Sequence, residues 1–222
     1  MKTVYRILTP IFALCVFPVM YFLPLLRAMV SSGLAAALTG STDGTKKNLL
    51  TSLLGIGEYT SIKDIVNISK GDSPVIETLK SLWNSLGEET KTKLTDEFSS
   101  VKFLIAAAVF FAIVLLIALL TAILGAALKK HTVPFVLSVG GIVSAVIMNS
   151  CFNAFAKPFV TNAINLSSLF GSSNETLGLL LGKAVSVDYL QLSIAYTVTV
   201  FIFVIIAIFS LCAIVEEKYS KD

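Results

Sequence analysis

Residues 103–156 read FLIAAAVFFAIVLLIALLTAILGAAL, then KKH, then TVPFVLSVGGIVSAVIMNSCFNAFA, and this stretch decides the fold. Neither apolar segment contains an Asp, Glu, Lys, Arg or His. A helix needs about 20 apolar residues to cross a bilayer core. In lipid, only a helix or a closed barrel satisfies every backbone hydrogen bond. The stretch therefore predicts two spans, 103–128 and 132–156, joined by a short basic turn.

Two further apolar runs predict two more spans, at about 7–29 and 189–215. The first run could instead be a signal peptide, because basic residues precede it and small residues follow it. Its apolar part exceeds the usual length of about 7–15 residues, which favours a retained span. Charged residues make up only 14% of the chain, against about 25% in soluble domains. We therefore expect an all-α integral membrane protein of one domain, 1–222, with four transmembrane helices.

The segments at about 31–100 and 158–187 are more polar, and we expect them to form a helical extracytoplasmic cap. Ser61 is expected to cap a short helix, and Ser73 with Pro74 predicts the start of another. That second helix would carry an apolar stripe at helical spacing. The stripe could pack inside the cap, lie on the lipid headgroups or bind a partner. Its members are Val75, Leu79, Leu82, Trp83 and Leu86.

Positive charges predict the orientation, because short cytoplasmic segments are enriched in Lys and Arg. They fall in the N-terminal segment, the hairpin turn and the C-terminal tail, which four spans would place on one side: Lys2, Arg6, Lys129, Lys130, Lys218 and Lys221. Both termini are therefore expected in the cytoplasm, in a protein of the plasma membrane. The candidate glycosylation sites then all fall on the outer side: Asn67, Asn165 and Asn174.

Polar residues inside the predicted spans gather toward the outer ends of the third and fourth spans. They are Asn149, Asn153, Gln191, Tyr196 and Thr199. Such residues could bond neighbouring helices or line a pore or cavity that opens outward. Ionisable residues, which commonly mark proton relays and ion coupling, are missing from the middle of every span. This argues against a proton-coupled pump.

The sequence contains none of the common metal, nucleotide or hydrolase motifs. We expect no enzyme, no cofactor, no metal and no nucleic-acid partner. The leading expectation is a non-enzymatic scaffold, accessory or receptor-like subunit. It would lie in the lipid bilayer and present its cap to a protein partner or to a second copy. The alternative is a channel or transporter subunit with a neutral polar lining from the third and fourth spans.

Overall fold

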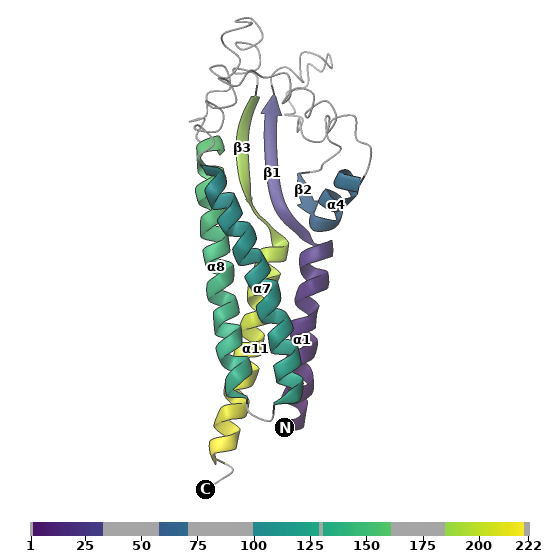
Figure 1. The fold of residues 1–222 in the computed structure, drawn as a ribbon, viewed down its shortest axis with the longest axis vertical. Coiled ribbons are helices and arrows are strands. Elements are labelled where there is room, and N and C mark those ends of the chain that lie inside the picture. The colour runs from purple at the N-terminus through teal and green to yellow at the C-terminus, as the bar shows by residue number, and fades with distance from the viewer. Residues whose placement is uncertain (1, 33–57, 71–99, 129–130, 161–184, 220–222) are drawn as a thin grey trace, which may run out of the picture. The chain divides into compact units, whose positions relative to one another are not determined.

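A computed structural model describes residues 2–32, 58–70, 100–128, 131–160 and 185–219 (Figure 1). Four of its helices are long and apolar enough to cross a membrane: α1 (Lys2–Phe22), α7 (Val101–Ala127), α8 (Thr132–Val160) and α11 (Ile194–Tyr219). Many large apolar side chains on these helices are exposed, as expected for groups that face lipid. The predicted four-span integral membrane protein is therefore confirmed at this level.

Contacts divide the chain into two units. The helical unit comprises Met1–Leu25, Ile105–Cys151 and Leu192–Asp222. The sheet unit comprises Leu26–Leu104 and Phe152–Gln191. The helical unit therefore holds most of each long helix, and the sheet unit holds the polar segments predicted to lie outside the membrane.

From the spacing of the buried residues and the contacts at Gly125 and Gly141, we infer that the core of the helical unit is built from layers, each with one buried residue from every helix. Phe209 of α11 has its ring centroid 5.8 Å from those of both Tyr5 and Phe12 of α1, which sets the register of this antiparallel pair. Buried positions recur at alternating spacings of four and three, the pattern of left-handed helical bundles. The layers are Thr9, Gly125, Pro134 and Ser210; Ala13, Thr121, Ser138 and Ile206; Val16, Ala118, Gly141 and Phe203; and Met20, Val114, Ala145 and Thr199.

Glycines allow the closest helix contacts. A methyl group at Gly141 of α8 would lie 2.7 Å from Cε1 of Phe203, so only glycine admits this ring. At Gly140 the nearest atom would be Cδ1 of Ile117 on α7, at 3.9 Å. Small residues let membrane helices approach closely. The close approach on α8 is that of Phe203 from α11 at Gly141, whereas the contact beside Gly140 has ordinary spacing.

The first span is shorter than predicted. The expected range of 7–29 fails because α1 ends at Phe22 and strand β1 (Pro24–Ser32) follows. Pro24 has no N–H to continue the helix, and it disfavours a helical conformation at Leu23. A proline is tolerated as the first residue of a strand. Because α1 begins at Lys2, Pro10 lies well inside this helix.

The fourth span starts later than predicted, at Ile194 instead of 189, and continues past 215 to Tyr219. Residues 185–192 form strand β3 (Val185–Leu192), in which apolar and polar residues largely alternate, as in a strand. The third span also ends later than 156, since α8 continues through Pro158 to Val160. Thr132 starts α8 as predicted.

The described residues are mostly helical, in line with the all-α expectation, and the sheet unit adds three strands that pair in the order β2-β1-β3. Strand β2 (Tyr59–Ser61) contributes three residues, and β1 and β3 run in opposite directions (Figure 1). The Ala28 N–H donates to the Glu58 carbonyl over 3.0 Å and ties β1 to the start of β2. The described part of the segments predicted to form the cap is therefore not purely helical.

The helix predicted after Ser61 is confirmed as α4 (Ile62–Lys70). The Asp64 N–H donates to Ser61 Oγ over 3.2 Å, and Asp64 Oδ2 accepts from the Ser61 N–H at 2.9 Å and the hydroxyl at 2.6 Å. This reciprocal arrangement is a capping box, which satisfies donors at the helix start. These bonds, led by the one from the Ser61 hydroxyl, lower the pKa of Asp64.

Candidate functional site

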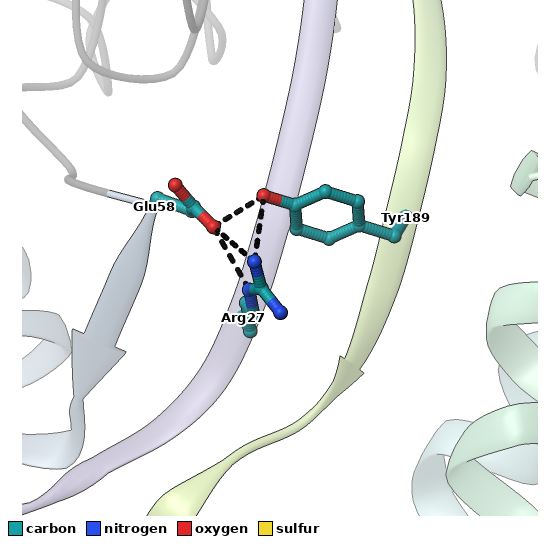
Figure 2. A network of polar contacts seen from close by, with 3 residues as sticks. All are labelled: Arg27, Glu58 and Tyr189. Carbon is teal, nitrogen blue, oxygen red and sulfur yellow. Dashed lines mark hydrogen bonds and ion pairs between the residues drawn. The ribbon is translucent and has the colours of Figure 1, made fainter.

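A polar network joins the three strands of the sheet unit, and Figure 2 shows its members, Arg27, Glu58 and Tyr189. Arg27 lies on β1, Tyr189 lies on β3, and Glu58 immediately precedes β2. These residues lie far apart in the sequence. Pairing of β1 with both of its neighbours brings their side chains together.

One carboxylate oxygen is the centre of the network. Glu58 Oε1 accepts from Arg27 Nε at 2.8 Å, and Arg27 Nη2 lies 2.8 Å from the same oxygen. The Tyr189 hydroxyl also donates to Glu58 Oε1. Arg27 Nη2 lies 3.5 Å from the Tyr189 hydroxyl oxygen. Hydrogen bonds to a charged group are stronger than those between neutral groups. The bonds to this oxygen therefore connect Glu58, which precedes β2, to both β1 and β3.

Two aromatic rings hold the Arg27 guanidinium. Its Cζ lies 4.6 Å from the ring centroid of Tyr189 and 5.2 Å from that of Tyr59. Cations within about 6 Å of a ring centroid are attracted by the ring quadrupole. Arginine suits this place because its planar guanidinium can stack on a ring while its N–H groups donate to the carboxylate, whereas a lysine ammonium has no plane to stack.

The network stabilises its charged groups. The pKa of Glu58 is lowered, chiefly by the hydrogen bond from Tyr189 and then by Arg27. The pKa of Tyr189 is raised because its proton is held by Glu58, and that of Arg27 is raised by the same carboxylate. A base poised for proton transfer needs a pKa near the working pH. The pKa of Glu58 is shifted in the opposite direction, so its carboxylate stays charged at neutral pH.

The charged side chains of the network are partly exposed. The side chains of Arg27 and Glu58 are 37% and 36% exposed, so each presents about a third of its surface to solvent. Within the described ranges, no group of three or more His, Cys, Asp or Glu residues could hold a metal ion.

The residues of the predicted polar cluster lie on three elements and differ in burial. Gln191 is exposed on β3 instead of lying on a helix, and Asn153 of α8 is also exposed. Asn149 and Tyr196 are half-buried on α8 and α11. Thr199 is fully buried in α11, and its hydroxyl has no hydrogen-bond partner among the described residues.

The other predicted sites are described only in part. The stripe of Val75, Leu79, Leu82, Trp83 and Leu86 lies outside the described residues, as do Asn165 and Asn174. Asn67 lies in α4 and is exposed, as a glycosylation acceptor must be.

The sequence analysis missed the polar network. Arg27 lies inside the first predicted span, and Tyr189 was placed at the start of the last one. Two local signals could have revealed these strands: Pro24 interrupts the first run, and residues 185–192 largely alternate between apolar and polar. The pairing with Glu58 had no local signal.

Comparison with protein-family models, curated proteins and solved structures found no match for this chain. The function must therefore be argued from its own residues.

Proposed function

We propose that this is a non-enzymatic scaffold, accessory or receptor-like subunit that presents its sheet unit to a protein partner or to a second copy. The polar network carries this proposal. Arg27, Glu58 and two tyrosines form a preorganised charged and aromatic surface, in which the two charged side chains are about one third exposed. Arginine and tyrosine are among the residues enriched at protein interfaces. The proposed location is the plasma membrane, with both termini in the cytoplasm and the sheet unit outside.

The first test is the mass of the assembly extracted from its native membrane in mild detergent. The proposal expects a hetero-complex or a homo-oligomer, which Glu58→Gln should weaken because the carboxylate charge that organises the surface is lost. Glu217→Gln makes the same chemical change on α11 and should leave the assembly intact. A bare monomer overturns the proposal. Equal assembly of both variants shows that the polar network is not the contact surface.

A second candidate is a channel or transporter subunit. It is favoured by the buried hydroxyl of Thr199, which lacks a partner among the described residues, and by half-buried Asn149. Neutral polar side chains inside a span can form hydrogen bonds with a polar solute that crosses the membrane. Thr199→Val with Asn149→Leu should then abolish flux through liposomes at normal expression. Exposed Asn153→Leu is the control, and unchanged flux in the double variant rejects this candidate.

A further inference from the structure

The layer of Thr9, Gly125, Pro134 and Ser210 differs from the other layers of the helical unit, because it carries two unpaired hydroxyls. Thr9 is 2% exposed and Ser210 is fully buried. Neither hydroxyl has a hydrogen-bond partner among the described residues. In the adjacent layer, Thr121 and Ser138 donate to carbonyls of their own helices at 2.7 and 2.8 Å. Hydrogen bonds within their own helices therefore pair both hydroxyls of the neighbouring layer, whereas the two hydroxyls of this layer have no such bond.

Helix register places the two hydroxyls at the same level. The Phe209 ring contacts both Tyr5 and Phe12, so Phe209 lies opposite the middle of the segment between them. Thr9 is in the middle of that segment. Ser210 follows Phe209 and is buried on α11. Contacts of Gly125 on α7 with Thr9 on α1 and Pro134 on α8 place residues of these three helices at the same level. A methyl group at Gly125 would lie 3.2 Å from Thr9 Cγ2 and 3.8 Å from Pro134 Cγ.

Pro10 adds a third polar group near this layer. It has no N–H, so the Arg6 carbonyl, one turn before it, loses its usual intrahelical donor. Prolines are tolerated in membrane helices where hydroxyls or ordered waters satisfy such freed groups. The carbonyl lies on the same helix as Thr9, three residues away, where one bridging molecule can reach both.

We propose that this layer binds water, with Thr9 Oγ1, Ser210 Oγ and the Arg6 carbonyl as its partners. An unpaired buried hydroxyl costs about 1–3 kcal/mol. A buried water typically makes two to four hydrogen bonds to groups of this kind. The site lies on the helical unit, so the inference does not rest on the interaction proposed for the sheet unit.

The decisive experiment measures magnetisation transfer from water to individual residues by solid-state NMR, on the full chain in lipid bilayers. The signals of Thr9 and Ser210 should grow at early mixing times. Those of Val16 and Ala118, which are buried in a layer without a hydroxyl, should grow late. If the two hydroxyl residues grow as slowly as Val16 and Ala118, the layer is dry and the proposal fails.

A matched pair of variants tests whether the hydroxyls share the water. Ser210→Ala should abolish the early transfer to Thr9, because one of the three partners is lost. Ser150→Ala removes an exposed hydroxyl that donates to the Val146 carbonyl, and it should leave the transfer to Thr9 unchanged. Unchanged transfer in Ser210→Ala overturns the shared site. If that variant does not fold, the measurement on the unaltered chain still decides whether the layer is hydrated.

Discussion

At the residue scale, two adjacent glycines of α8 have different roles. Gly141 faces the Phe203 ring, whose nearest atom would lie 2.7 Å from an added methyl group, whereas Gly140 has ordinary space at 3.9 Å. A periodic small-residue pattern indicates close packing but does not say which glycine receives the ring. The neighbouring helix decides that.

Gly141→Ala should therefore destabilise the protein by about 1–3 kcal/mol, because the ring must move or the helices must separate. Gly140→Ala is the matched control and should have little effect. Unfolding in detergent, followed by circular dichroism, measures both. The Phe203→Leu background should reduce the cost of Gly141→Ala, as expected for residues in direct contact. Equal costs at Gly140 and Gly141 contradict the assigned contact.

Glu58 is the other residue whose role can be tested alone. Its folded pKa lies below the ordinary value of 4.5. Its contribution to stability is therefore fully present above pH 4.5 and is lost as the pH falls through the lowered pKa. The Ala28 amide donates to the Glu58 carbonyl, so its protection factor in hydrogen exchange, measured relative to the intrinsic rate at each pH, should fall in that acidic range.

Glu58→Gln should show the faster Ala28 exchange already at neutral pH, since the charge is absent at every pH. Glu217→Gln should exchange like the unaltered chain. An Ala28 amide that responds equally to both substitutions, or to neither, would mean that the carboxylate does not hold the strands together.

At the element scale, a short helix illustrates what local chemistry can specify. The capping box of α4 involves only Ser61 and Asp64, three residues apart, and the serine was recognisable from sequence. The strands illustrate the opposite case. Apolar composition around β1 resembled a membrane span, and only pairing with β2 and β3 gives those backbone groups partners.

Ser61→Ala should weaken α4 by about 0.5–2 kcal/mol, the usual cost of losing an N-cap hydroxyl. Amide exchange within α4 should rise, and Ser61→Thr should restore most of the protection because threonine also caps. The pKa of Asp64 lies below its ordinary value of 3.8, so the contribution of this carboxylate should fade only as the pH falls through that lowered value. An alanine variant with unchanged α4 exchange would show that the box contributes nothing.

At the scale of the whole molecule, an even number of spans returns the chain to the side from which it started. Four such helices occur in the described residues, so tags at the two termini should share one side of a sealed vesicle. Proteolysis of both tags before and after permeabilisation measures this. Tags on opposite sides would require one of the four helices not to cross.

The proposed outer position of the sheet unit makes a separate prediction. In a eukaryotic host, Asn67 should acquire glycan, because it is exposed and lies in an Asn-Ile-Ser sequon. Asn67→Gln should remove the corresponding mass. An unmodified Asn67 together with glycosylation of a sequon inserted near the N-terminus would reverse the proposed orientation.

The sequence by itself determined the four membrane helices, because long uncharged apolar runs have one stable arrangement in lipid. It also specified local features such as the start of α4 at Ser61. Only the tertiary structure decided where the first and last spans stop, since β1 and β3 replace helix where they can pair with each other. It alone brought Arg27, Glu58 and Tyr189 together and opposed Thr9 to Ser210. These arrangements depend on contacts between distant segments, and neither hydropathy nor residue spacing within one segment records such contacts.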